Sequence, residues 1–268
     1  MSNSSGSHDI KVSEAFSKLL EDQGFRIRLN VLSENLAPLI SQAISNFKFL
    51  TPKLVAVLDG LRDLPDRYRE AILVVANEGW YIDPDEMSFD APAQLAQKIL
   101  DGRKDEAEIF LIEHFRERIS TIVAELSTQF PSRKTIFEQA MEAHRLGLYA
   151  VCVPTYLIQV DGVCVEISKK HFFMKARGNK NGHPQIASYI KEITEDPLTL
   201  AMLAPLTEIH SINQTNREAG FNKLNRHTVL HGESLDYATE ANSLRALSML
   251  YYVSRSLKEY CQKDASKK

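Results

Sequence analysis

Three side chains near the C-terminal end of the chain could transfer protons and stabilise negative charge together. Arg226, His227 and His231 stand in the order R-H-x-x-x-H, and Gly232 follows directly. A guanidinium keeps its charge and can hold two phosphate oxygens with its planar fork. An imidazole exchanges protons near neutral pH. This combination is suited to the chemistry of a phosphodiester.

Among phosphodiesters, RNA needs the fewest catalytic groups from a protein, because its own 2′-OH is the nucleophile. Cleavage then needs a proton acceptor, a proton donor for the leaving 5′-oxygen, and positive charge for the crowded phosphorane. His231 fits either proton-transfer role, and Arg226 fits the stabilisation of charge. This chemistry needs no cofactor, and we expect none.

The spacing restricts how these residues can act. Residues five apart on an ideal helix are separated by about 140°, so Arg226 and His231 share a face only if the helix ends between them. Gly232 favours such an end. His227 and His231 lie four apart and could hold zinc, but no H-E-x-x-H glutamate and no third ligand accompany them. We therefore predict no metal. For the motif as a whole, the alternative to a catalytic role is a structural one, a helix cap satisfied by Arg and His.

An Arg, a polar residue, three arbitrary residues and a His, between helices of a helical domain, resembles the HEPN family. The resemblance covers roughly the last half of the chain and implies a helical bundle that pairs as a homodimer. Many members are metal-independent RNases of defence, toxin and RNA-processing systems. The resemblance implies that Arg226 and His231 are catalytic, and that a second copy of the motif supplies the remaining acid or base.

Further site residues are expected around this motif. The resemblance assigns His227 to substrate contact, and Asn225 is a second candidate for the same work. It also implies that Asp161 and Glu166 approach the site as supporting acidic residues, provided that their segment is helical.

A basic, glycine-containing stretch offers a separate contact to RNA. Lys175 and Arg177 lie in it, directly after Phe172 and Phe173. The cations could bind the RNA backbone while a phenylalanine stacks on a base. The alternative is a solvated connector whose phenylalanines belong to the core.

The elements that must position these residues are predicted from apolar periodicity. One segment is ambiguous: residues 156–167 combine β-rich flanks with Asp161-Gly162, typical of a hairpin, but also form a helical stripe kinked at Pro154. We choose the helix, because the surroundings are helical and the resemblance requires it. Other helices are expected at residues 12–20, 25–50, 51–61, 65–76, 93–100, 105–126, 184–193, 197–213 and 239–260.

The predicted fold is all-α, a helical bundle of HEPN type preceded by a second helical unit. The expected divisions are a disordered tail at residues 1–9, an N-terminal unit at 10–130, a HEPN-like domain at 131–262 and a polar tail at 263–268. Residues 1–130 carry 14 Lys+Arg and 21 Asp+Glu, a net charge of −7, which leaves +4 of the total of −3 for the remainder. A mildly basic second half can attract phosphate, although ordinary solvated surfaces would look the same.

The composition is that of an average soluble protein, with 44% hydrophobic and 25% charged residues. Three cysteines, none in a C-x-x-C pair, indicate a reduced, cytoplasmic protein. We expect neither a signal peptide nor a membrane span.

Two functions are therefore carried forward. The first is an endoribonuclease that cleaves single-stranded or loop RNA in a bacterial defence, toxin or stress system. The second is a catalytically silent HEPN-like module for dimerisation or for binding RNA or protein, with a regulatory partner on the N-terminal unit.

Overall fold

The computed structural model describes residues 60, 62–83, 86–176, 183–214 and 221–265, the last seven of them by backbone alone. Within these residues the secondary structure is helical, and the predicted all-α fold is confirmed. The helices expected before residue 60, the tail at 1–9 and the candidate Arg177 lie outside the described residues.

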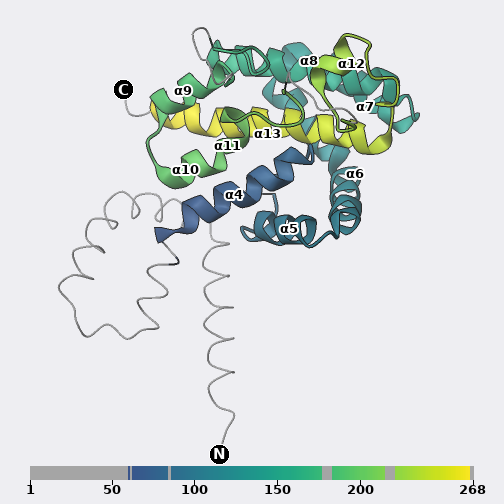
Figure 1. Cartoon of the computed structure of the whole chain (residues 1–268). Helices are drawn as coiled ribbons and strands as arrows, with labels where there is room; N and C mark the ends of the chain where they lie inside the picture. Colours follow the sequence, from purple (N-terminus) through teal and green to yellow (C-terminus); the bar gives the residue numbers. More distant parts are fainter. Residues whose placement is uncertain (1–59, 61, 84–85, 177–182, 215–220, 266–268) are drawn as a thin grey trace, which may run out of the picture.

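Three helices form the first part of the described chain (Figure 1). They are α4 (Leu64–Asn77), α5 (Ala91–Leu100) and α6 (Lys104–Gln129), each close to its predicted range. Pro65 and Pro92 stand in the first turns of α4 and α5, where a missing N–H costs nothing. Between α4 and α5, Trp80 is buried and stacks on Phe115 of α6, with ring centroids 5.7 Å apart.

The centre of the molecule is the packing of α8 (Tyr149–Ser168) along α13 (Glu240–Ala265). A short 3₁₀ turn, η1 (Pro131–Arg133), and α7 (Lys134–Arg145) precede them, and α7 packs against α8. The helix predicted over residues 156–167 is thereby confirmed. Gly162 does not make a turn: a Cβ there would lie 2.5 Å from Nη1 of Arg133, whose Nη2 donates to the Gly162 carbonyl. The glycine gives the guanidinium room to approach the helix.

α8 is long and apolar enough to cross a membrane, judged by its length and composition alone. Its buried side chains face the bundle, among them Cys152, Tyr156, Leu157 and Val160, which are fully covered. A core helix of a soluble protein has this same apolar composition, because it is covered by neighbouring helices instead of lipid.

Pro154 inside α8 links this helix to the segment that carries the R-H-x-x-x-H motif. A proline has no N–H, so the carbonyl of Ala150, four residues earlier, loses its helical partner. The hydroxyl of Tyr237 donates to this carbonyl at 3.1 Å. The loop after the motif is thus fastened to the first turns of α8.

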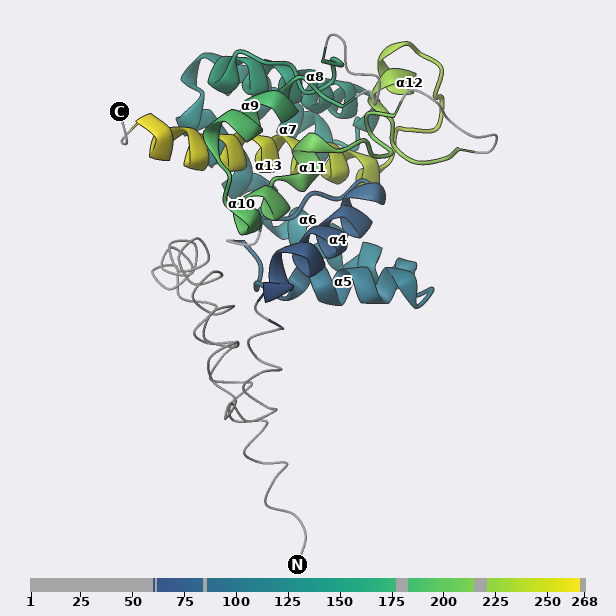
Figure 2. The ribbon, with the colours of Figure 1, turned by 60° about the vertical axis from the view of Figure 1, so that its left-hand side comes forward.

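Three short helices cover one side of α13: α9 (Ile186–Ile193), α10 (Pro197–Met202) and α11 (Ala204–Thr207), as Figure 2 shows. The prediction of one continuous helix over 197–213 was wrong. Pro205 cannot continue the backbone ladder of α10 and instead stands in the first turn of α11. The chain then turns at residues 211–213 and delivers the following segment to α12 (Arg226–Leu230).

The expected division after residue 130 falls inside a continuous hydrophobic core. Buried residues from Tyr68 to Leu257 form one cluster. Polar contacts cross the division as well: the Tyr81 amide donates to Oγ of Ser248, and Gln129 donates to the carbonyl of Ser254. The first helices therefore pack directly on α13 and share its core.

Candidate functional site

The R-H-x-x-x-H motif occupies α12, a helix of five residues whose two ends are closed by specific hydrogen bonds. At its C-terminal end, His231 is the cap residue and Gly232 follows with φ +72°. The amide of Glu233 donates to the carbonyl of Thr228, and that of Gly232 to the carbonyl of Val229. This is a Schellman ending, and it confirms that the helix stops at His231.

Asn225 caps the other end of α12 and is fully buried. Its carbonyl oxygen accepts from the amides of His227 and Thr228, and its amide group donates to the carbonyls of Ser211 and Gln214. The Asn225 side chain has no solvent-exposed surface that a substrate could contact. Its prediction as a substrate-contacting residue was wrong, because the amide is consumed in holding α12 against the 211–214 turn.

Arg226 begins α12 and turns towards the segment that follows α8. Its backbone N–H donates to the carbonyl of Ile212, and Cζ lies 5.3 Å from the centroid of the Phe173 ring. Nε is buried without a hydrogen-bond partner. Within the described parts of the chain no carboxylate pairs with this guanidinium. Arg226 is a half-buried cation held by an aromatic ring, with its charge uncompensated among these residues.

The two histidines of the motif lie on the side of α12 that faces solvent. Their ring centroids are 4.2 Å apart, and Nε2 of His227 lies 3.5 Å from a carboxylate oxygen of Glu233. His231 is exposed. No cluster of three or more His, Cys, Asp or Glu side chains that could hold a metal ion occurs in the described portion of the chain. The two imidazoles thus lie side by side on the solvent-facing side of α12, next to Glu233.

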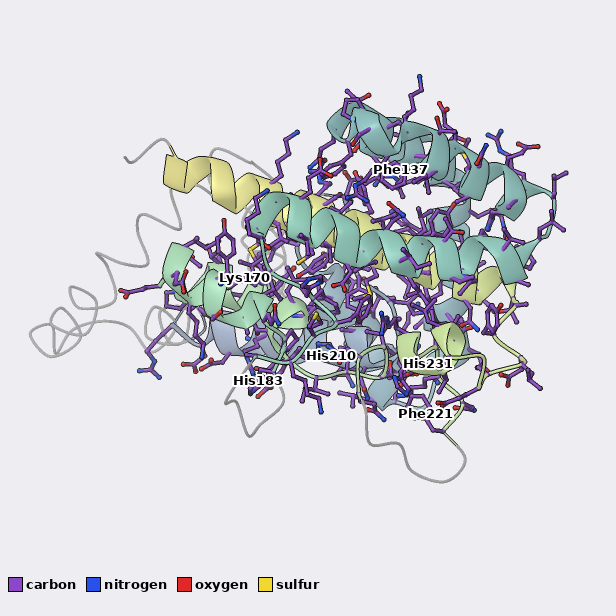
Figure 3. The ribbon with its side chains drawn as sticks, turned by 90° about the horizontal axis from the view of Figure 1, so that it is seen from above. Phe137, Lys170, His183, His210, Phe221 and His231 are labelled. Atoms are coloured by element: carbon purple, nitrogen blue, oxygen red, sulfur yellow. The ribbon has the colours of Figure 1, made fainter. Side chains whose placement is uncertain are left out.

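Arg226 and His231 project from opposite ends of α12. A five-residue helix is about 7.5 Å long, which sets the separation of its two ends along the axis. No hydrogen bond joins them directly in the described structure, and their ring contacts differ: Arg226 has Phe173, and His231 has His227. Figure 3 shows His231 on α12 and Lys170 where α8 ends.

Asp161 organises the segment that contacts Arg226. One carboxylate oxygen accepts from the backbone amides of Phe172 and Phe173, at 2.8 and 3.1 Å. The other lies 3.2 Å from Nδ1 of His171. Asp161 is therefore linked to Arg226 through Phe173, and its expected supporting role stays a prediction.

The remaining predicted residues lie elsewhere. Glu166 is exposed and forms an ion pair with Arg133 at 2.8 Å, on the side of α8 that faces η1. Lys175 is exposed and forms an isolated antiparallel bridge with Pro184. Neither Glu166 nor Lys175 contacts α12 through a hydrogen bond or ion pair within the described residues.

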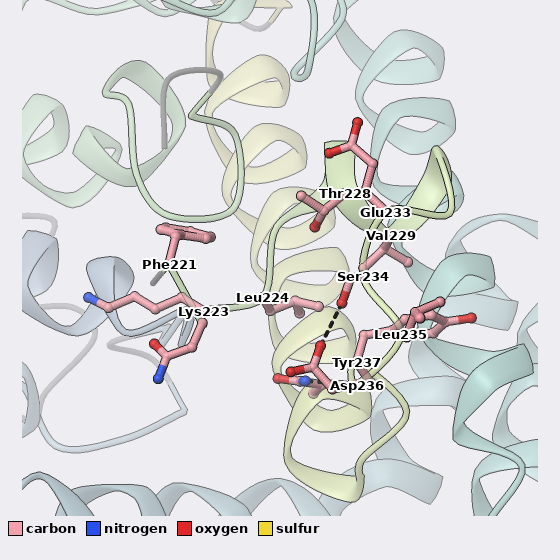
Figure 4. A pocket seen from close by; sticks show the side chains of 12 residues that line it. Phe221, Lys223, Leu224, Thr228, Val229, Glu233, Ser234, Leu235, Asp236 and Tyr237 are labelled. Atoms are coloured by element: carbon pink, nitrogen blue, oxygen red, sulfur yellow. Dashed lines mark hydrogen bonds between the residues drawn. The ribbon is translucent and has the colours of Figure 1, made fainter. Parts of the chain in front are cut away.

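A polar groove of about 600 Å³ lies beside α12, with Thr228 and Val229 in its wall (Figure 4). It lies between Phe221 to Leu224 and the loop from Glu233 to Tyr237, with Asn242 of α13 at one end. Its cation, Lys223, is already paired with Glu78 at 2.9 Å. Asp236 accepts from the hydroxyl of Ser234. With its lysine neutralised and two further carboxylates in its wall, the groove does not favour phosphate.

The chain matches no family model, no curated protein and no solved structure.

His171 is the residue that sequence reasoning missed. It follows Lys169-Lys170 and precedes Phe172-Phe173, and only the phenylalanines and the cations drew attention. The sequence did contain a signal, because an aspartate and a histidine, Asp161 and His171, can form a carboxylate–imidazole pair. Their encounter depends on the chain reversing after α8, which the sequence did not indicate.

Proposed function

We propose that this protein is a metal-independent endoribonuclease of HEPN type that cleaves single-stranded or loop RNA by attack of the 2′-OH. The observation that carries the proposal is Arg226. Part of its guanidinium is buried, it rests on Phe173, and no described carboxylate neutralises it. Burying a charged donor without a partner is unfavourable, so an anionic ligand would complete the site.

His231 supports the second half of the proposal. It is exposed at the end of the same short helix, and its ring contacts another imidazole. An exposed imidazole can exchange a proton with a bound ligand, which suits it to donate to the leaving 5′-oxygen. Arg226 would hold the phosphorane oxygens, and His227 would contact or orient the phosphate.

The proposal includes a homodimer, because an apolar surface lies beside the motif. Leu235 is 90% exposed, and Tyr237 in the same loop is bonded to Ala150 of α8. Leu148 and Val151, at this end of α8, are also exposed. Contiguous exposed apolar surface is typical of an interface. A second copy placed here would bring another His231 close to the first, and light scattering at micromolar concentration should give twice the 30.3 kDa mass.

The alternative function is a catalytically silent binding or dimerisation module of the same type. The observation that favours it is the lack of a direct contact between Arg226 and His231 within one described chain. Such a module would bind RNA through Arg226 without cleaving it.

Cleavage in the presence of EDTA separates the two functions. We propose to incubate end-labelled single-stranded and hairpin RNA with the unaltered chain, Arg226→Ala and His231→Ala. Arg103→Ala, an exposed arginine of the N-terminal part, and His183→Ala serve as matched controls. If the protein is an endoribonuclease, Arg226→Ala and His231→Ala should each lower the cleavage rate roughly a hundredfold or more, and the two controls should not. Binding of RNA without cleavage by the unaltered chain would favour the silent module.

Placed in a cell, the proposed enzyme acts in the cytoplasm, in a bacterial defence, toxin or stress response. The helices before residue 130 would then regulate it by binding a partner. Their acidic balance of −7 is unsuited to RNA, which leaves RNA contact to the second half.

A further inference from the structure

His171 and Asp161 form a carboxylate–imidazole pair that is linked to Arg226 through Phe173 and that the R-H-x-x-x-H motif does not include. Oδ2 of Asp161 lies 3.2 Å from Nδ1 of His171. Oδ1 of the same carboxylate accepts from two backbone amides, so its position is fixed by three groups. The backbone N–H of His171 in turn donates to Oε1 of Gln185.

This arrangement selects one form of the His171 ring. A carboxylate can only accept hydrogen bonds, so a neutral imidazole facing it carries its proton on Nδ1. Nε2 is then left with a lone pair. The side chain of His171 is 42% exposed, so this lone pair is open to a ligand. An imidazole held in this way by a carboxylate is suited to accept a proton from a hydroxyl group.

Phe173 connects this pair to Arg226. Its backbone amide is bound by Asp161, and its ring lies under the Arg226 guanidinium. Phe172 beside it is buried and packs edge-on against it, at 4.9 Å between ring centroids. One carboxylate therefore positions both the imidazole of His171 and the ring that supports the arginine.

We propose that His171, oriented by Asp161, is the general base of the proposed ribonuclease, an inference that rests on that function. Nε2 of His171 removes the proton of the 2′-OH, and the 2′-oxygen attacks phosphorus. The bond from phosphorus to the 5′-oxygen breaks, and His231 donates the proton that this oxygen takes up. A 2′,3′-cyclic phosphate and a 5′-OH are formed. His171 thus supplies, within one chain, the second proton-transfer group that the motif lacks.

The roles of the two histidines can be separated with a changed leaving group. In RNA with sulfur in place of the scissile 5′-oxygen, the leaving group is a thiolate. Its departure needs no general acid. We expect the cleavage rate of His231→Ala to fall roughly a hundredfold on ordinary RNA and to return to that of the unaltered chain on the sulfur substrate. His171→Ala should lose a similar factor on both substrates, since a missing base is not replaced. His183→Ala is the matched control, because its Nδ1 is also held, by the carbonyl of Thr207 at 2.9 Å.

The outcomes distinguish this inference from the function on which it rests. Cleavage by His171→Ala at the unaltered rate, with His231→Ala inactive, would overturn the role of His171 and leave the ribonuclease in place. Absence of cleavage by the unaltered chain would overturn both.

Asp161→Asn provides a test that does not depend on activity. The asparagine carbonyl can still accept from Phe172 and Phe173, but its NH₂ group would face Nδ1 of His171 and donate to it. The neutral ring should then move its proton to Nε2 and lose the base. Imidazole nitrogen and carbon shifts in NMR report the tautomer: we expect Nδ1–H in the unaltered protein and Nε2–H in Asp161→Asn. An Nε2–H ring in the unaltered protein would contradict the proposal.

Discussion

At the scale of single residues, the account depends on Arg226 acting through its shape as well as its charge. The guanidinium lies over Phe173 and presents a planar fork, whereas a lysine ammonium is a compact point charge. Arg226→Lys should therefore fall well short of the unaltered rate, while Arg226→Ala should lose roughly a hundredfold or more. Single-turnover cleavage measures both. Full activity of Arg226→Lys would mean that bidentate contact and stacking are unimportant.

Residue types and spacing singled out Arg226, His227 and His231 as candidates, because all three lie within one short stretch of the chain. They were insufficient for His171. Its partner Asp161 lies ten residues earlier, and the two meet because Lys169 takes a left-handed conformation, with φ +60°, and reverses the chain after α8. A lysine carries no sequence signal for that conformation. Asn225 was misjudged because asparagine suits two roles, an exposed substrate contact and a buried helix cap. The sequence does not show that this side chain is buried.

At the scale of elements, the ending of α12 at His231 can be tested through Gly232. A residue with a Cβ pays about 1–2 kcal/mol for the left-handed conformation that this glycine adopts. Gly102 is a matched control, because it has φ +79° and, like Gly232, open space around its Cα. Gly232→Ala and Gly102→Ala should lower the free energy of unfolding alike. Only Gly232→Ala should reduce cleavage, and equal activity of the two variants would contradict a role for the helix ending.

The turn at residues 210–214, which holds Asn225, should make the fold sensitive to acid. His210 in this turn is buried and hydrogen-bonds to the carbonyl of Pro205, and burial lowers its pKa to about 4, whereas nearby Glu208 opposes this shift and Arg69 adds to it. The unfolded chain binds a proton near pH 6.5, so stability is present above that pH and is lost as pH falls towards 4. The loss amounts to about 3 kcal/mol.

Chemical denaturation at pH 7 and pH 4.5 measures this effect in the unaltered chain and in His210→Gln. His144 also has a pKa lowered by burial, so both proteins lose some stability in acid. His210→Gln should lose less, because glutamine does not titrate. Equal losses in the two proteins would show that His210 does not set the acid sensitivity.

At the scale of the whole molecule, the packing of the first helices on α13 predicts that the C-terminal half does not fold by itself. The Tyr251 hydroxyl lies within hydrogen-bond distance of Glu86 and Glu125, and Arg255 pairs with Asp83 at 2.9 Å. A chain beginning at Ser132 would expose this face of α13, including the buried rings of Tyr251 and Tyr252. We expect it to lose near-ultraviolet circular dichroism and cooperative thermal unfolding. A sharp unfolding transition close to that of the full chain would establish two separate domains.

The sequence predicted the helices well and their grouping less well, for a physical reason. Apolar periodicity reports that a helix has a buried face but not which element covers it. The long helices α6, α8 and α13 were therefore found, while the shared core across residue 130 was not. The break in the 197–213 helix at Pro205 was predictable from proline chemistry and was overlooked.

The central claim is that this chain positions a cation and imidazoles around a phosphodiester that supplies its own nucleophile. The most direct measurement is cleavage, in EDTA, of an RNA with one 2′-deoxy substitution at the scissile nucleotide, beside the unsubstituted RNA. We predict that the unsubstituted RNA yields a 2′,3′-cyclic phosphate, or its opened 3′-phosphate, and a 5′-OH. The substituted RNA should resist cleavage. Equal cleavage of both RNAs, or loss of all cleavage in EDTA, would contradict the account.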